Sequence, residues 1–252
     1  MKQEKQNPFI KYNGIKDAKV HIHKTSGLYD ASNEHDACGV GMIVDIHGNK
    51  SHELVDSALK VLENMKHRGA EGADNKTGDG AGIMLQIPHE FILLQGIPVP
   101  EKGKYGTGLV FLPKDEQEQS HMLSVMIEEI EREGLNLMHL RNVPVNSSIL
   151  GKDASATEPS IKQIFITGST DTENLERTLY IIRKRIENRI HHKDFYIVSL
   201  SSKNIVYKGM LSSMQVREYF PDLTRPQRGQ FEALYAPVSY THLRAHETVL
   251  DL

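Results

Sequence analysis

The sequence contains one cysteine, Cys38, and no tryptophan among its 252 residues. A single thiol cannot form an intramolecular disulfide, and one thiolate cannot hold an iron–sulfur cluster by itself. No apolar run is long enough to cross a bilayer, and the charged start, MKQEKQNPFIKYNG, lacks the apolar core of a secretory signal. We therefore expect a cytoplasmic protein that does not contact a membrane.

The chain also lacks a strong charge of one sign. Its formal net charge is -3, which gives no electrostatic reason to expect a nucleic-acid partner. No phosphate-binding G-x-x-x-x-G-K-[ST] motif occurs, and GDGAG lacks the acidic partner and helix context of a dinucleotide fingerprint. Apolar residues make up 38% of the chain, as in ordinary globular proteins, so its function must be sought in individual residues.

The apolar pattern predicts a mixture of strands and helices. Strands are expected at 39–46, 81–87, 106–112, 137–145, 161–168, 194–202 and 204–211, and helices at 52–66, 88–95, 115–135 and 172–190. Helical spacing places Leu54, Ala58, Val61, Leu62 and Met65 on the buried face of the first helix, and Met122, Val125, Met126 and Ile130 on that of the third. Residues 146–160 are predicted to form a surface loop. The last two strands are expected to form a hairpin, which favours an α+β fold over a parallel sheet.

Cys38 follows 37 residues that are mostly polar and show no sustained period, and it precedes two glycines, Gly39 and Gly41. Glycine inside a strand often marks the close approach of a ligand or another backbone. Four interpretations of the thiol are open from the residues alone. It could be a small buried hydrophobe, the partner of a histidine as in cysteine proteases, or a metal ligand with His35 and Asp36.

In the fourth interpretation, the chain is cut before Cys38. The new α-amino group, whose ordinary pKa is about 7.7–8.0, could then take the thiol proton without a histidine. This interpretation accounts for the weakly patterned leader, but composition does not choose it over the others.

Three strings in a fixed order, ACGVG, HRGA and TGDGAGI, resemble the start of the glutaminase domain of glutamate synthase large subunits. That domain is a class II glutamine amidotransferase. The resemblance continues through GTGLVFLPKD to YKGMLSSMQVREYFPDL, and so covers about Leu28 to Leu223. It implies an α+β fold of the N-terminal-nucleophile hydrolase type, a four-layer αββα sandwich that is incomplete in this chain.

The resemblance also implies a reaction. Residues 1–37 would be a propeptide, removed autocatalytically between Ala37 and Cys38, and residues 38–224 a partial glutaminase domain. The Cys38 thiolate would attack the side-chain amide of glutamine, form a γ-glutamyl thioester and release ammonia, and water would then release glutamate. In complete family members the ammonia converts 2-oxoglutarate to glutamate, with FMN, an iron–sulfur cluster, and a small subunit or other electron donor. For this chain itself we expect no cofactor and no metal.

Two further residues match the family strings. Arg68 of HRG could bind the substrate carboxylate, since a guanidinium pairs well with it, or its charge could cap the preceding helix. Asp79 of TGDGAG could bind substrate, orient Arg68 or stabilise a turn. We predict both as substrate-binding residues, with the structural alternatives open.

The family pattern fails after Leu223. An HSRFSTNT motif, whose arginine helps hold the glutamine α-carboxylate, and a later Asn-Gly pair that forms the oxyanion hole are expected there, and neither follows. Instead, VSYTHLRAHET at Val238–Thr248 resembles a translated sequencing adapter of the transposon type. We therefore expect residues 225–252 to be a non-native tail, with no function for His242 and His246, and the chain to have low stability and little glutaminase activity.

Two other functions stay open. The chain could belong to another class II amidotransferase that feeds ammonia to a different acceptor. It could also be a non-catalytic interaction module whose cysteine is part of the core.

Overall fold

The computed structural model describes residues 39–69, 71–168, 172–224 and 238–243. The chain divides into two compact units, Met1–Asp36 and Ala37–Leu252, and every described residue belongs to the second. Its strands are β1 (Gly39–Val44), β2 (Ala81–Gln86), β3 (Tyr105–Leu112), β4 (Leu135–Asn142), β5 (Ser160–Gly168), β6 (Tyr196–Ile197), β7 (Asn204–Gly209) and β8 (Val238–Leu243). Its α-helices are α1 (His52–Asn64), α2 (His89–Leu94), α3 (Glu116–Arg132), α4 (Lys152–Ala156), α5 (Thr172–Arg189) and α6 (Gln215–Tyr219). Short 3₁₀ helices are η2 (Lys66–Arg68), η3 (Ser147–Ile149) and η4 (Pro221–Leu223).

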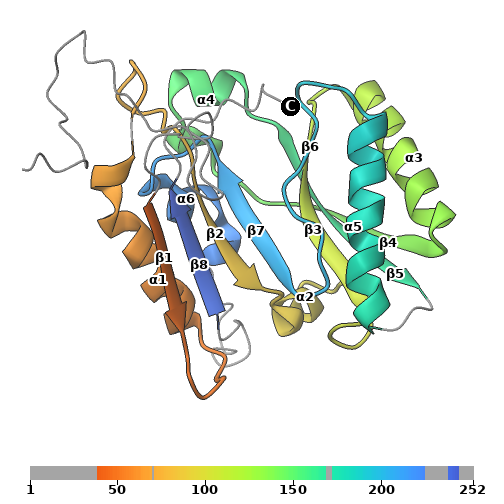
Figure 1. Ribbon diagram of the computed structural model, residues 1–252. Coiled ribbons are helices and arrows are strands. Elements are labelled where there is room, and N and C mark those ends of the chain that lie inside the picture. The colour runs from red at the N-terminus through yellow and green to blue at the C-terminus, as the bar shows by residue number, and fades with distance from the viewer. Residues whose placement is uncertain (1–38, 70, 169–171, 225–237, 244–252) are drawn as a thin grey trace, which may run out of the picture. The chain divides into compact units, whose positions relative to one another are not determined.

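The strands form two sheets, with the orders β1-β8-β2-β7 and β4-β5-β3-β6. Every strand pairing between the described residues is antiparallel, which confirms the predicted α+β class. In Figure 1 the first sheet lies on the left with α1 beside it, and α5 and α3 lie together on the right. The strand β8 comes from the segment predicted to be a non-native tail, and it lies between β1 and β2.

Two cores hold these layers together. The first combines side chains of α1 and β2 with one face of β3 and β5, including Leu62, Ile83 and Phe165. The second lies between the other face of β3 and β5 and the helices α3 and α5, and includes Val110 and Ile164. The second sheet is therefore buried on both faces, as its nearly continuous apolar strands require.

The helices form where the sequence gives both a start signal and an apolar stripe. Asp115 caps α3, because its carboxylate accepts hydrogen bonds from the backbone amides of Gln117 (3.0 Å) and Glu118 (2.9 Å). The predicted inward residues of α3 are all buried: Met122, Val125, Met126 and Ile130. The buried face of α1 is rotated about the helix axis from the predicted face. The buried residues are Val55, Ala58, Leu59 and Leu62, whereas the predicted Leu54, Val61 and Met65 are only partly buried.

The predicted hairpin between 194–202 and 204–211 is wrong. β6 pairs with β3 of the second sheet, whereas β7 pairs with β2 of the first. After β6 the chain continues along β3, and Gly108 permits this close approach: a Cβ there would lie 1.6 Å from the carbonyl oxygen of Ser199. Ser201 still forms backbone hydrogen bonds with Thr107 of β3 (2.9 and 3.1 Å), so the chain passes to the first sheet only between Ser201 and Asn204, where β7 begins.

The prediction of a surface loop at 146–160 is also wrong. This stretch contains η3 and α4, and it buries Leu150 and Ala154 in the first core. Its small polar residues are typical of a loop, but hydrogen bonds from its backbone amides to Asp74 and Thr77 of a distant loop hold the stretch in place.

One face of the first sheet is exposed along β1, its edge strand. Paired residues of neighbouring strands point to the same face, so Ile83 and Tyr207 face the core while Val40 lies on the opposite side. On that side Val40, Met42 and Val44 are exposed by 64%, 57% and 43%. With Ile46 in the turn after β1, which is 88% exposed, they form what we call the β1 row. Within the described ranges, no helix is long and apolar enough to span a bilayer.

Candidate functional site

The candidate site lies at one end of the first sheet. Gly39 of β1 and Ala81 of β2 both pair with Leu243 of β8, and Ala81 also pairs with Gly209 of β7. One row across the sheet therefore joins the starts of β1 and β2 to the end of β7. The predicted nucleophile Cys38 directly precedes this row, although Cys38 and Ala37 themselves lie outside the described residues.

The HRG segment lies against the first residue of β1. A Cβ added to Gly39 would lie 3.1 Å from the sulfur of Met65 and 3.3 Å from the Cβ of Arg68, so η2 covers this position closely. The Arg68 side chain is exposed and has no hydrogen bond or ion pair with another described residue. It is the imidazole of His67 that contacts the last carbonyl of α1, on Asn64, at 3.2 Å. Arg68 therefore does not cap α1 through its side chain, whose first carbons lie beside the start of β1.

The TGDG segment ends a loop that an internal aspartate holds rigid. The Asp74 carboxylate accepts hydrogen bonds from the hydroxyl of Thr77 (2.6 Å) and from the amides of Thr77 (2.7 Å), Lys76 (3.0 Å) and Lys152 (2.8 Å). These hydrogen bonds, that from the Thr77 hydroxyl foremost, lower the pKa of Asp74 well below its usual range. Glu71 and Gly78 close the loop as an isolated antiparallel bridge.

This loop packs directly on the segment that follows β7. A Cβ on Gly78 would lie 2.1 Å from the backbone of Leu211 and Ser212, so only glycine permits this contact. Gln215 ties the segments together: its side chain accepts from the Ser212 amide (2.8 Å) and donates to the carbonyls of Lys76 (3.0 Å) and Ile149 (2.9 Å). Both loops at this end of the sheet are therefore held in fixed positions.

Two polar side chains in these loops are buried without a partner. Both carboxylate oxygens of Asp79 and the hydroxyl of Ser213 are inaccessible to water and form no hydrogen bond inside the described portion of the chain. The structure brings Asp79 and Arg68 to the same end of the sheet but forms no ion pair between them. Unsatisfied buried polar groups are uncommon in native proteins and call for an explanation such as a catalytic role.

Sequence reasoning selected Asp79 by its motif but missed Ser213. Ser213 lies in GMLSSMQ, a string that has no recognised spacing of chemical groups. Its burial (3% exposed) and missing partner follow from the packing of Gly78 on the neighbouring peptide, which no local pattern reveals.

Comparison with known proteins decides the family. A family model of class-II glutamine amidotransferases matches residues 38–237. The chain belongs to this family. The NADPH glutamate synthase large chain of Bacillus subtilis is 40% identical over 228 residues, which cover 88% of this chain and 15% of that protein. NADH glutamate synthase of Saccharomyces cerevisiae is 41% identical over 229 residues, covering 81% and 11%.

Ferredoxin-dependent glutamate synthase 2 of Synechocystis is 41% identical over 200 residues, covering 77% of this chain and 13% of that protein. The amidotransferase chain is therefore similar to one segment of much longer enzymes that are named for three electron donors. The family match begins at Cys38, the residue that adjoins the row of Gly39, Leu243 and Ala81.

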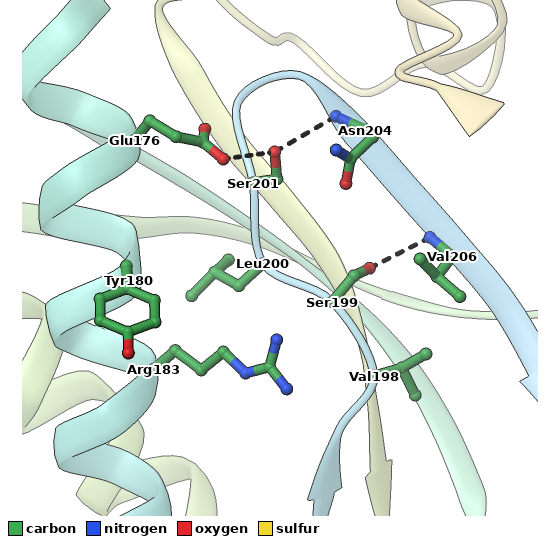
Figure 2. A pocket seen from close by; sticks show the side chains of 9 residues that line it. All are labelled: Glu176, Tyr180, Arg183, Val198, Ser199, Leu200, Ser201, Asn204 and Val206. Atoms are coloured by element: carbon green, nitrogen blue, oxygen red, sulfur yellow. Dashed lines mark hydrogen bonds between the residues drawn. The ribbon is translucent and has the colours of Figure 1, made fainter. Parts of the chain in front are cut away.

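A cavity elsewhere in this amidotransferase is separate from that row. About 360 Å³ in volume, it lies between α5 and residues 198–206 (Figure 2). There the Glu176 carboxylate accepts hydrogen bonds from the hydroxyls of Ser201 (2.7 Å) and Ser202 (2.6 Å). Asn204, which lines the cavity, is the first residue of β7, and Gly209 of the row is its last. At the rise per residue of an antiparallel strand, these two residues lie roughly 17 Å apart.

No group of three or more histidine, cysteine, aspartate or glutamate side chains suited to a metal occurs across the described ranges. The chain contains one cysteine, so a cluster with several cysteine ligands does not fit it.

Proposed function

We propose that this chain is the glutaminase segment of a glutamate synthase, with Cys38 as its nucleophile. The observation that supports this most is the meeting of the HRG and TGDG segments at the end of the first sheet that residue 38 adjoins. Arg68 and Asp79, which are 11 positions apart in the sequence, thus bring a guanidinium and a buried carboxylate to the end of the sheet where β1 begins.

The chemistry begins with maturation. Hydrolysis of the peptide bond between Ala37 and Cys38 consumes one water and leaves a free α-amino group on Cys38. That amino group takes the thiol proton, and the thiolate attacks the side-chain carbonyl carbon of glutamine. The carbon–nitrogen bond breaks, the proton passes to the leaving nitrogen, and ammonia departs from a γ-glutamyl thioester. Water then cleaves the thioester to glutamate and restores the thiol.

Arg68 is our candidate for binding the α-carboxylate of glutamine. Its guanidinium forms no hydrogen bond or ion pair with another described residue, and its first side-chain carbons lie against Gly39, one residue after the proposed nucleophile. A guanidinium binds a carboxylate through two parallel hydrogen bonds, which would orient the substrate as well as hold it. Asp79 is the second substrate-binding candidate.

The complete fold we propose is the four-layer αββα sandwich. The helices α3 and α5 cover the outer face of the second sheet and supply one helical layer. The helix α1 packs with β2 inside the first core, and the exposed β1 row on the opposite face of the first sheet is apolar surface that the other helical layer of the complete sandwich would cover. Residues 1–37 are then a propeptide and 225–252 a non-native tail, so that β8 takes the place between β1 and β2 that a native strand would fill.

The parts of the reaction beyond ammonia release belong to the rest of such an enzyme. The chain spans about a seventh of the relatives' length, and its one cysteine does not fit the ligand set of a cluster. We therefore assign FMN, the iron–sulfur cluster, 2-oxoglutarate and the electron donor to the remainder of a cytoplasmic glutamate synthase.

Covalent labelling tests the nucleophile without requiring turnover. Because Cys38 is the only cysteine, 6-diazo-5-oxo-L-norleucine, a glutamine analogue with a reactive diazoketone, should add once to the chain, and glutamine should protect. Intact mass and N-terminal sequencing should show a chain that starts at Cys38. Cys38→Ala should abolish both labelling and leader removal. A chain that keeps residues 1–37, or labelling that glutamine does not slow, would show that the thiol is not the nucleophile.

A further inference from the structure

We propose that the cavity between α5 and residues 198–206 binds an amino acid with a cationic side chain, lysine or arginine. Arg183 would hold the α-carboxylate of this ligand, and Glu176 would accept a hydrogen bond from the cation at the end of its side chain. The inference does not depend on the proposed glutaminase activity, because no residue that lines this cavity belongs to the site at the end of the first sheet.

A polar stripe of α5 lines one side of the cavity. Glu176, Tyr180 and Arg183 are spaced by four and three positions, so they lie on one face of the helix. Figure 2 shows the side chains of Glu176 and Arg183 extending from α5 toward residues 198–206. The polar face of a helix usually meets bulk water, whereas this stripe lines a cavity of about 360 Å³, a volume typical of ligand sites.

The opposite side of the cavity is formed by β7 and the segment that precedes it. The Ser199 hydroxyl accepts a hydrogen bond from the Val206 amide (3.2 Å), and the Ser201 hydroxyl accepts one from the Asn204 amide (3.2 Å). These contacts fix the wall in place, and the side chains of Leu200 and Val206 give it an apolar surface. A mostly apolar wall with a few fixed polar groups is the usual composition of a ligand site.

The guanidinium of Arg183 has hydrogen-bond donors that are not used. Its Nε donates to the Glu187 carboxylate at 2.7 Å, and its two Nη atoms form no hydrogen bond with another described residue. The Arg183 side chain is only 28% exposed, so these donors have lost part of their contact with water. A guanidinium stays charged and binds a carboxylate through two parallel hydrogen bonds. The Arg183 end of the cavity therefore suits a carboxylate.

The carboxylate of Glu176 supplies a fixed negative charge at the other end. It accepts hydrogen bonds from the hydroxyl of Ser201 (2.7 Å) and from the amide and hydroxyl of Ser202 (2.7 and 2.6 Å). Burial works against this charge, but the hydrogen bonds outweigh burial and lower the pKa of the carboxyl, so that Glu176 is ionised at neutral pH. A carboxylate has about four lone-pair sites, so roughly one is left for a donor on a ligand. A cationic donor is favoured there, because hydrogen bonds between charged groups are the stronger ones.

The separation of the two charges selects the length of the ligand. Glu176 and Arg183 are seven positions apart in α5, which places their Cα atoms roughly 10 Å from each other. The ammonium and carboxylate on the α-carbon of an amino acid are too close together to contact both side chains. In lysine and arginine, a long apolar stem separates the side-chain cation from the α-carboxylate. That stem would lie along the apolar wall at Leu200 and Val206.

Saturation-transfer difference NMR on the full chain measures this binding with the ligands themselves. L-Lysine and L-arginine should each bind saturably. L-Norleucine keeps the carboxylate of lysine but lacks its side-chain ammonium, and 1,5-diaminopentane keeps the ammonium but lacks the carboxylate. Each of these two should bind at least about tenfold more weakly than lysine, the factor expected for the loss of one hydrogen bond between charged groups.

Variants test the same contacts from the side of the protein. Arg183→Gln and Glu176→Gln should each raise the dissociation constant of lysine at least about tenfold. The matched control is Arg177→Gln, which removes an exposed arginine of α5 that does not line the cavity and should leave the constant unchanged. If a variant does not fold, the comparison of lysine with norleucine or diaminopentane on the unmodified chain tests the contact that the variant was to remove.

Several results would overturn the proposal. If neither lysine nor arginine binds saturably, the cavity holds only solvent. If norleucine or diaminopentane binds as tightly as lysine, one of the two charged contacts is absent. If Arg183→Gln leaves lysine binding unchanged and glutamine displaces the lysine, the ligand occupies the proposed glutaminase site instead. A chain that binds lysine as expected but is not labelled by the glutamine analogue would overturn the proposed function alone.

Discussion

The ion pair between Arg141 and Asp222 gives a quantitative test of how this fold is held together. Arg141 of β4 donates to both carboxylate oxygens of Asp222 in η4, at 2.7 and 2.8 Å, and to the side chain of Gln163 at 3.1 Å. The two charged side chains are only 12% and 6% exposed. Burial works against the charge of Arg141, but the hydrogen bonds to Asp222 outweigh it and raise the pKa of the guanidinium. The pair thus fastens the end of the described core, after α6, to the second sheet.

Replacing Asp222 by alanine leaves a buried guanidinium without its counter-charge. Removing one partner of a buried pair costs about 3–5 kcal/mol, so the free energy of unfolding should fall by that amount. For a domain of this size, each kcal/mol lowers the melting temperature by about 2–4 °C, which gives a loss of roughly 10 °C. Urea unfolding followed by far-ultraviolet circular dichroism measures the change.

A double-mutant cycle isolates the pair itself. Arg141→Met with Asp222→Leu removes both charges, and it should be less destabilised than the sum of the single variants by about 1–3 kcal/mol. The control is Glu101→Gln, which breaks an exposed pair with Lys104 and should leave the urea midpoint unchanged. If Asp222→Ala costs no more than this control, or if the cycle shows additive effects, the pair does not hold the two parts together.

Two other perturbations have defined outcomes. Burial favours the protonated form of Glu176, but hydrogen bonds from Ser202 and Ser201 outweigh burial and lower the pKa of the Glu176 carboxyl. The ionised carboxylate therefore stabilises the fold above the unfolded-state pKa of about 4.3, and this stabilisation is lost as the pH falls below that value. Glu176→Gln should flatten the fall in urea midpoint between pH 5 and pH 3, and an unaltered slope would contradict this. Gly108→Ala places a Cβ 1.6 Å from the Ser199 carbonyl and should destabilise the fold by at least 1–3 kcal/mol, about the cost of overpacking. Gly48→Ala, in open space with φ +74°, should cost only the ~1–2 kcal/mol of a left-handed residue, so a Gly108→Ala variant that melts no lower than Gly48→Ala would contradict the close approach of Ser199 to Gly108.

Elements whose local pattern agrees with their surroundings could be predicted from the sequence. The strands β2 and β3 and the helix α3 lie within a few residues of the predicted ranges, because their apolar periods match the faces that they bury. For β4 the observed range is displaced by two to three residues toward the N-terminus, since the ladder with β5 and its irregularity near Leu137 and His139 determine the bounds.

Errors arose where tertiary contacts override local pattern. The segment 194–211 has the sequence of a hairpin, yet its first half pairs with β3, where Gly108 permits the close approach of Ser199, and its second half pairs with β2. The Glu176 carboxylate holds Ser201 and Ser202 at the end of the first half. At the site, motif reasoning selected Arg68 and Asp79 but could not show that one lies exposed and the other buried without a partner. Asp74 and Gln215, which fix the loops, act through residues up to 139 positions away and leave no local signal.

The β1 row also bears on how the chain behaves in solution. Four apolar side chains at alternate positions give neighbouring molecules a flat surface on which to associate, and sheets in solution usually protect such surfaces with charge. With a net charge of only -3, long-range repulsion between copies is weak. The isolated chain should therefore attract itself increasingly as its concentration rises, which static light scattering would register as a negative second virial coefficient.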